Sequence, residues 1–168
     1  EYTNLIEEYG VKVVSCGFSG TIFSLMKVYK TFQKLQIEVN TIKPDIIHSH
    51  IFLADILVRA LKRPNSCLVT TFHRPEPWWD KSDIKSRLKT WLEGRTARNK
   101  VKHYIAVSEE AKKMAVKRLG VQSNYIKVVM NGVDTELFQS KQGVKNSRLV
   151  VIHVARFYPE KSHELLIT

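Results

Sequence analysis

The chain has 168 residues, of which 43% are hydrophobic and 26% are charged. This composition is typical of a soluble globular domain and excludes the disordered and fibrous classes, and no stretch approaches the roughly 18 consecutive apolar residues that a membrane-spanning helix needs. The net charge of +11 favours an anionic partner, such as nucleotide phosphates, an acidic membrane surface or nucleic acid. Cys16 and Cys67 are too few and too far apart for a disulfide scaffold or a metal site, so we expect reduced core thiols in a cytoplasmic protein.

The first part of the chain alternates short apolar runs with longer helical patterns. Residues 11–15 (VKVVS) predict a strand, and residues 21–43 predict a helix that ends before Pro44. A strand over residues 45–48 and a helix over residues 52–61 follow. The first of these helices is expected to bury an apolar face: Phe23, Met26, Tyr29 and Leu35.

The middle of the chain repeats the pattern with a longer helix. Residues 67–72 (CLVTTF) predict a strand, and the two prolines of the RPEP segment keep the following loop extended. Ser82 or Asp83 can cap a long helix that runs to about Val101. Four apolar residues near helical spacing define the face that this helix is expected to bury: Ile84, Leu88, Trp91 and Leu92.

Two further strands and a capped helix complete this part of the chain. Residues 103–107 predict a strand, Ser108 caps a helix that runs through Leu119, and Gly120 is well placed to end it. Residues 125–130 predict another strand, which the NGVD turn closes. Five strands joined by helix-length crossovers predict the α/β class, with a Rossmann-like, doubly wound parallel sheet.

The last part of the chain changes character. Residues 139–148 are polar and indicate a linker. A strand over residues 149–154 and a helix that begins near residue 160 start a new layer. Since one strand and one helix cannot bury their own surfaces, these residues predict the beginning of a second domain.

Polar residues follow the predicted strands at their carboxyl ends, where open α/β sheets bind their ligands. His48 and His50 close the segment DIIHSH, and His73 closes the segment TTFH. We expect His48 and His50 to point to opposite faces of the sheet, so that at most one of them acts in a site. A zinc site from the three histidines is disfavoured, because the spacing is wrong and no carboxylate or thiolate lies in the same turn.

Five sequence blocks in register resemble the retaining glycosyltransferases of family 4, which have the two-domain GT-B fold. The blocks are PDIIHSH, TTFH, YIAVSEEAKK, VVMNGVDTELF and VARFYPEKSHELLI. The resemblance implies that residues 1–138 form an acceptor-side Rossmann-like domain that is incomplete at its N-terminus. It also implies that residues 139–148 form the interdomain linker, and that residues 149–168 form the first strand and helix of a truncated donor-binding domain.

The resemblance further implies a hexosyltransferase-type activity, without metal or cofactor, that moves a sugar from a nucleoside diphosphate to a hydroxyl acceptor with retention. Arg156 and Lys161 would bind the donor diphosphate, His73 would be the catalytic residue on the acceptor side, and His50 would be a weaker acceptor-side candidate. The acceptor would be a bacterial surface polysaccharide or a glycolipid. Ala155 and Ser162 replace two glycines that are usual in the family. The family's glycine-rich loop and its carboxylate pair would lie outside this chain, so we expect the fragment alone to be inactive.

Two other functions are considered beside this one. A GT-B-fold sugar-nucleotide epimerase would share the architecture, but the NGVD block argues against it. A basic α/β nucleic-acid-binding module is supported by charge alone, without an aromatic platform, a recognition helix or a zinc pattern.

The segment from Lys81 to Lys102 holds eight cations against two acids. A solvated helix face is the plain explanation of this excess. The alternative is peripheral docking on the anionic inner face of the cell membrane. The cations that would make this contact are Lys81, Lys85, Arg87, Lys89, Arg95 and Arg98.

Overall fold

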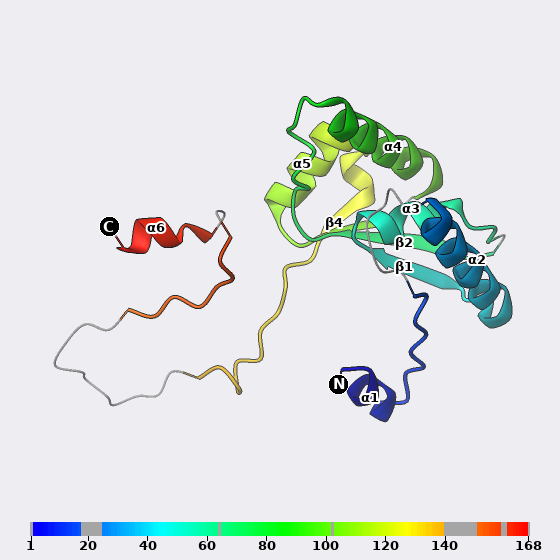
Figure 1. The fold of residues 1–168 in the computed structure, drawn as a ribbon, viewed down its shortest axis with the longest axis horizontal. Helices are drawn as coiled ribbons and strands as arrows, with labels where there is room; N and C mark the ends of the chain where they lie inside the picture. Colours follow the sequence, from blue (N-terminus) through cyan, green and yellow to red (C-terminus); the bar gives the residue numbers. More distant parts are fainter. Residues whose placement is uncertain are drawn as a thin grey trace. The chain divides into compact units, whose positions relative to one another are not determined.

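The computed structural model describes residues 2–17, 25–63, 65–101, 103–139, 151–158 and 161–167. The chain divides into two compact units, Glu1–Asn131 and Gly132–Thr168, and each is described by itself. Figure 1 shows the elements of both. The first unit contains α1 (Tyr2–Glu8), α2 (Leu25–Ile42), β1 (Ile46–His50), α3 (Phe52–Ala60), β2 (Cys67–Phe72), α4 (Ile84–Lys100), β3 (His103–Ala106), α5 (Glu109–Leu119), the 3-10 turn η1 (Ser123–Tyr125) and β4 (Ile126–Val128). The second unit contains α6 (His163–Ile167).

The first unit is built on a four-stranded sheet in the order β1-β2-β3-β4, and all three strand pairs are parallel. Each strand lies beside its predecessor in the sequence, so right-handed crossovers place the connecting helices α3, α4 and α5 on the same face of the sheet. Helix α4 packs against both α3 and α5 (Figure 1). The parallel Rossmann-like α/β fold predicted from the sequence is confirmed.

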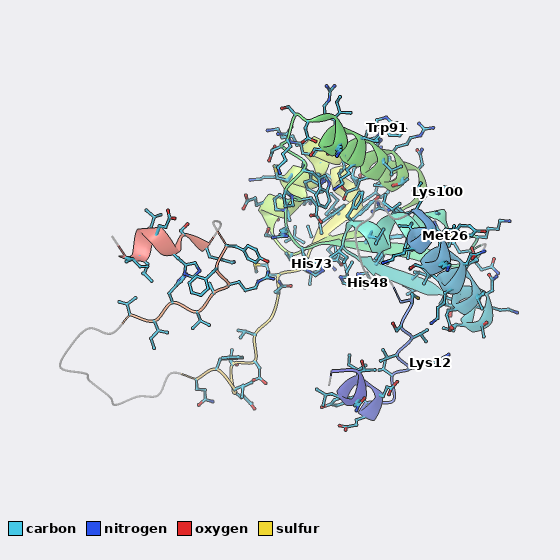
Figure 2. All side chains as sticks on the ribbon, in the orientation of Figure 1. Lys12, Met26, His48, His73, Trp91 and Lys100 are labelled. Carbon is cyan, nitrogen blue, oxygen red and sulfur yellow. The ribbon has the colours of Figure 1, made fainter. Side chains whose placement is uncertain are left out.

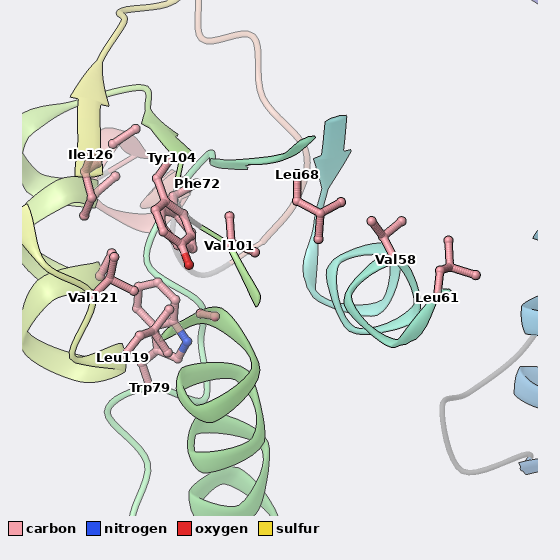
Figure 3. Packing of buried hydrophobic residues seen from close by; sticks show 14 residues of the cluster. Val58, Leu61, Leu68, Phe72, Trp79, Val101, Tyr104, Leu119, Val121 and Ile126 are labelled. Atoms are coloured by element: carbon pink, nitrogen blue, oxygen red, sulfur yellow. The ribbon is translucent and has the colours of Figure 1, made fainter. Parts of the chain in front are cut away.

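The core of this unit lies between the sheet and these helices (Figure 3). The rings of Phe72 and Tyr104 stack across β2 and β3 with their centroids 5.3 Å apart, and Trp79 meets Phe72 edge to face at 6.1 Å. Leu119 of α5 and Val58 of α3 close the cluster on the helical side. Each large apolar side chain removed from water contributes about 1.5–3 kcal/mol, so this cluster holds the strands in register.

The helix ends form as their sequences predict. The Asp83 carboxylate accepts a hydrogen bond from the Ser86 N–H at 3.0 Å, and the Ser108 hydroxyl accepts one from the Ala111 N–H at 3.1 Å. Gly120 ends α5 with a φ of 67°, in the left-handed region that favours glycine. These caps fix where α4 and α5 begin and where α5 ends.

Two helices bury faces other than those predicted. In α2, Met26 and Tyr29 are exposed, and the partly buried residues that pack toward the core are Phe32, Leu35 and Val39. In α4, the predicted face points to solvent: the exposed fraction is 84% for Ile84, 60% for Leu88 and 57% for Trp91. The buried residues of α4 are Ser86, Glu93, Gly94 and Ala97.

Close packing explains the reversed face of α4. A Cβ added to Gly94 would lie only 2.9 Å from the Leu119 carbonyl oxygen of α5. The contact between α4 and α5 therefore needs small side chains, and the larger apolar residues of α4 are left on the opposite face. Leu92 is half-buried between the two faces.

Three predicted strands differ from the structure. Residues 11–15 form no strand, although β1 is the edge of the described sheet and no described strand pairs with its outer side. The strand predicted over residues 125–130 shortens to β4: η1 takes its first residue, and Val129 and Met130 lie beyond its end. The described residues 151–154 also form no strand. A short apolar run needs a paired neighbour before it becomes a strand.

The predictions for the cysteines, for Phe23 and for the linker have different outcomes. Cys67 is exposed and Cys16 is half-buried, so the prediction of core thiols is wrong for Cys67, which begins a strand at the sheet end. Phe23 and residues 140–148 of the predicted linker lie outside the described residues. The domain boundaries at residues 138 and 148 stay predictions.

Candidate active site

The carboxyl ends of β1 and β2 bring two of the predicted residues together. The parallel register pairs His50 with Thr71, and His73 follows at the end of β2. The Nδ1 atom of His50 lies 2.8 Å from Nε2 of His73, which is hydrogen-bond distance. His48 lies two residues before His50 on β1, and its Nε2 atom is 2.7 Å from the Thr71 hydroxyl oxygen. Figure 2 labels His48 and His73 at this edge of the first unit.

The prediction that His48 and His50 point to opposite faces is wrong. Their ring centroids lie 4.3 Å apart, on the same face of the sheet. Residues two positions apart on a strand share a face, because side chains alternate with a period of two. The three rings therefore form a row, with the His50 and His73 centroids 5.0 Å apart.

The electrostatics of the row keep its middle member neutral. Partial burial lowers the pKa of His50, and the neighbouring His48 and His73 lower it further. A neutral imidazole carries one N–H and one acceptor nitrogen, so a single proton links His50 and His73. The neutral His50 ring can therefore hold the His73 ring in place through this contact.

A cavity of about 420 Å³ opens beside His73. Its walls come from the start of α3, the end of β2, the loop after β2 and one side of α4. The rings of Phe52 and Trp78 meet edge to face at 5.0 Å, and the Lys89 ammonium lies 4.8 Å from the Trp78 ring centroid. Carboxyl groups of Asp55 and Glu76 complete the wall. The cavity thus combines aromatic surface with hydrogen-bonding groups.

Buried charges form the floor of this cavity. Asp55 and Arg59 pair on α3 at 3.8 Å, and the Arg59 guanidinium also donates to the Thr70 hydroxyl at 3.4 Å. Glu93 accepts a hydrogen bond from the indole N–H of Trp79 at 2.9 Å. Burial raises the pKa of Glu93 to about 7 and raises that of Asp55, although Arg59 opposes the shift in Asp55.

Two polar atoms on the cavity wall lack partners among the described residues. The Oδ1 atom of Asp55 and the indole N–H of Trp78 are buried and accept or donate no hydrogen bond there. Asp55 as a whole is 2% exposed. A buried polar atom without a partner is costly, and the fold holds these two atoms in place despite that cost.

The backbone is strained at the mouth of the cavity. Ile51 joins β1 to α3 with a φ of 68°, a region that β-branched residues rarely adopt. Such a conformation costs about 1–3 kcal/mol and persists where the surrounding structure holds it. Ile51 also lines the cavity. The strain therefore lies at the turn that leads from the histidine row into α3.

Sequence reasoning missed most of this cavity. Asp55, Arg59 and Glu93 lie at polar positions of amphipathic helices, where charges are normally solvated. The spacing of Asp55 and Arg59, one helical turn apart, was a usable signal for an ion pair. No signal in the sequence distinguished the Glu93 carboxylate, which is 1% exposed, from the exposed charges around it.

Arg156 and Lys161 lie in the second unit, where both are exposed. The Arg156 guanidinium lies 5.1 Å from the Tyr158 ring centroid, and its backbone carbonyl is 2.9 Å from His163 Nε2. The Lys161 N–H donates to the Tyr158 carbonyl at 2.9 Å. Both cations thus belong to one turn that precedes α6. Within the first unit, His50 and His73 are in direct contact.

Neither a metal-binding cluster nor a helix that could span a membrane is present in the described residues. No group of three histidine, cysteine, aspartate or glutamate side chains in the described ranges is arranged to hold a metal ion. Among the helices of the described part, none has the length and apolar character needed to cross a membrane.

A family model and a sequence relative both indicate a glycosyltransferase. The family model described as Glycosyltransferase Family 4 matches residues 5–137. The UDP-Gal:alpha-D-GlcNAc-diphosphoundecaprenol alpha-1,3-galactosyltransferase of Escherichia coli is 29% identical over 151 residues, an alignment that covers 83% of this chain and 37% of that enzyme.

Solved structures resemble the chain in fold. The crystal structure of Anabaena HepE in complex with UDP matches with a TM-score of 0.63 at 18% identity, and its complex with UDP-glucose matches with a TM-score of 0.59 at 17% identity. Each match covers 84% of this chain and 36% of HepE, so the chain spans little more than a third of these relatives. Since the family model covers most of the chain, the chain belongs to glycosyltransferase family 4.

Proposed function

We propose that the protein transfers a sugar from a uridine-diphosphate donor to a hydroxyl group of an acceptor, with retention at the anomeric carbon. The bond from the sugar to the diphosphate breaks and a bond to the acceptor oxygen forms, which yields the glycoside, the nucleoside diphosphate and a proton. Family membership and the names of the relatives support this reaction: the Escherichia coli enzyme is named for UDP-Gal, and HepE is described with UDP and with UDP-glucose.

The single observation that carries the proposal is the contact between His50 and His73 beside the cavity. In this proposal His73 hydrogen-bonds the acceptor hydroxyl that attacks the donor sugar. His50 orients the His73 ring through the 2.8 Å contact and fixes which nitrogen carries the proton. Burial and the neighbouring rings lower the pKa of His50, which favours the neutral form of this orienting ring.

Arg156 and Lys161 are proposed to bind the donor diphosphate. Negative charge grows on the diphosphate as the sugar leaves, and cations held close to it lower the energy of the transition state. A guanidinium also suits phosphate oxygens geometrically, because its N–H groups bind two of them at once. The proposal therefore assigns leaving-group stabilisation to these two side chains rather than to a divalent metal.

The cavity beside His73 is proposed to hold the acceptor sugar. Its rings, Phe52 and Trp78, offer apolar surface to the C–H face of a sugar, while the side chains of His73 and Glu76, which also line the cavity, can bind hydroxyl groups. A surface glycan or a lipid-linked sugar fits this chemistry. The Escherichia coli relative is named for an acceptor on diphosphoundecaprenol, and this supports transfer at a membrane surface.

The neighbouring alternatives receive no support of this kind. An epimerase would need no acceptor, whereas the comparisons name transferases. Nucleic acid would be attracted by the net charge, but a cavity lined by three carboxyl groups beside the histidine pair is unfavourable for phosphate.

The test is product analysis with the full-length protein. We expect it to release UDP from a UDP-hexose only when an acceptor is present, and to form a glycoside whose anomeric configuration, read by NMR, matches that of the donor. Arg156→Ala and Lys161→Ala should each abolish transfer, while Lys113→Ala, which removes an exposed cation of α5, should leave it unchanged. An inverted product would refute retention. Full transfer by both site variants would refute their role.

A further inference from the structure

The outward face of α4 carries a row of apolar side chains in the middle of a basic surface. Ile84, Leu88 and Trp91 are mostly exposed, as given above. At about 100° per residue, the three lie within an arc of about 60° on the helix. The buried residues Ser86 and Glu93 lie on the far side of the helix. The row is therefore a solvent-facing stripe and not part of the core.

Cations flank the row on both sides. Helical geometry places Arg87 and Arg98 along one flank and Lys85 along the other. Arg95 lies within the row itself, with its guanidinium 5.8 Å from the Trp91 ring centroid. Figure 2 shows Trp91 on α4 at the rim of the first unit, apart from His48 and His73.

The charge of α4 is almost entirely at the surface and positive. The helix carries six cations and one acid, Glu93, which is 1% exposed and hydrogen-bonded to Trp79. Burial raises the pKa of Glu93 to about 7, so near neutral pH it carries only part of a negative charge. No acidic side chain of α4 therefore offsets the cations at the surface.

A basic groove adjoins the row at Trp91. This groove of about 580 Å³ is lined by residues of α4, α5 and the loop before α4. Two of its cations have partners within the chain: Arg98 donates to the Leu119 carbonyl, and Arg118 pairs with Asp80. The cations that line the groove are Lys81, Arg87, Arg98, Lys117 and Arg118. A groove of this charge suits a phosphate group.

We propose that α4 is the docking element of this protein on an anionic lipid bilayer. The helix lies in the plane of the interface, with Ile84, Leu88 and Trp91 inserted among the lipids and the cations that flank this row at the lipid phosphates. A helix with an apolar stripe, basic flanks and a tryptophan is the form that binds such interfaces. The inference deepens the proposed transfer at a membrane surface. It rests on the proposed function only where it links the bilayer to a lipid-linked acceptor.

Two other occupants fit the face less well. A second copy of the chain docked on this face would bring the cations of one row against the same cations of the other, and no acidic side chain of α4 lies on this face to offset them. These cations are Lys85, Arg87, Arg95 and Arg98. Nucleic acid would neutralise the cations, but it would leave the apolar row against phosphates and water. A lipid bilayer offers apolar tails to the row and phosphate groups to the cations that flank it.

Vesicle binding of the full-length protein tests the inference. We expect it to co-sediment with phosphatidylcholine vesicles that contain phosphatidylglycerol, and not with phosphatidylcholine alone. Binding should weaken with salt, since charges at the surface are screened. Each cation near an anionic surface contributes roughly fivefold in partition coefficient, so Arg87→Ser with Arg95→Ser should weaken binding by about 25-fold.

Variants of the apolar row distinguish insertion into the bilayer from binding by charge attraction alone. Ile84→Ser, Leu88→Ser and Trp91→Ser together should abolish sedimentation, although they change no charge. The matched control is Met26→Ser with Tyr29→Ser, which alters exposed apolar residues of α2 and should leave binding intact. The tryptophan emission should shift to shorter wavelength on vesicles, and Trp91→Phe should remove most of that shift.

The outcomes are distinct from those of the proposed function. Unchanged vesicle binding by the triple serine variant would overturn the inference, as would sedimentation that depends on duplex DNA or on dimer formation through α4. Transfer to a water-soluble acceptor should be the same in the triple variant and the wild type. A protein that binds vesicles through α4 but transfers no sugar would refute the proposed function and leave the docking inference standing.

Discussion

Replacement of Arg59 by methionine should show how strongly the buried Asp55 carboxylate depends on the Arg59 guanidinium for its stability. The side chains of Arg59 and Asp55 are 1% and 3% exposed, and their nearest charged atoms lie 3.8 Å apart. Arg59→Met leaves the Asp55 carboxylate buried without a cation, and the loss of one partner of a buried ion pair costs about 3–5 kcal/mol. Whole domains are stable by about 5–15 kcal/mol, so the variant should lose a large share of its free energy of unfolding.

A double-mutant cycle isolates the pair. Asp55→Asn with Arg59→Met removes both charges, so we expect a smaller loss than the sum of the single variants, with a coupling of at least about 1 kcal/mol. Urea unfolding followed by tryptophan emission measures each value, since Trp79 is 3% exposed in the core and is released on unfolding. Additive losses, within about 0.5 kcal/mol, would refute the idea that Asp55 depends on Arg59.

Two further predictions concern α4. Burial raises the pKa of Glu93 from 4.5 to about 7, so the folded state holds a proton that the unfolded state releases. Stability should therefore fall as the pH rises from about 4.5 to 7, by roughly 3 kcal/mol, and this part of the pH dependence should vanish in Glu93→Gln, as unfolding at several pH values would report. Gly94→Ala should destabilise the protein by about 1–3 kcal/mol despite its gain in helix propensity, because the new Cβ meets the Leu119 carbonyl at 2.9 Å. Gly132→Ala, where a Cβ meets nothing within 4 Å, is the control in thermal unfolding, and equal effects of the two would contradict the packing account.

Local chemistry made the elements of the first unit predictable. Asp83 and Ser108 cap their helices, and Gly120 ends α5 in the left-handed region, as short side chains and a missing Cβ dictate. The strand β2 has the bounds that its apolar run predicts. Alternation of strands and helices was then enough to predict a parallel sheet.

Packing between helices was not predictable in the same way. The spacing of Ile84, Leu88 and Trp91 favours a buried face, but the close approach of α5 at Gly94 decides which face turns inward. Periodicity reports that a helix has an apolar stripe. It does not report whether the stripe meets the core or a partner outside the unit.

The candidate site was predictable in its residues and not in its arrangement. Block resemblance pointed to His50 and His73, and the parallel register of β1 and β2 brings them into contact. The cavity beside them depends on side chains from α3 and α4, such as Asp55 and Glu93, which only the fold brings together. The spacing of residues along one helix does not determine how closely a second helix packs against it.

The assignment of the active site depends most directly on His73. One measurement tests it: acceptor-dependent UDP release by the full-length His73→Ala variant. We expect a loss of at least about a hundredfold, the lower range for a residue that positions or accepts a proton. His103→Ala, which removes an exposed histidine from the opposite end of the sheet, should release UDP at the wild-type rate. Equal rates for the His73 and His103 variants would contradict the assignment of the active site to this edge of the sheet.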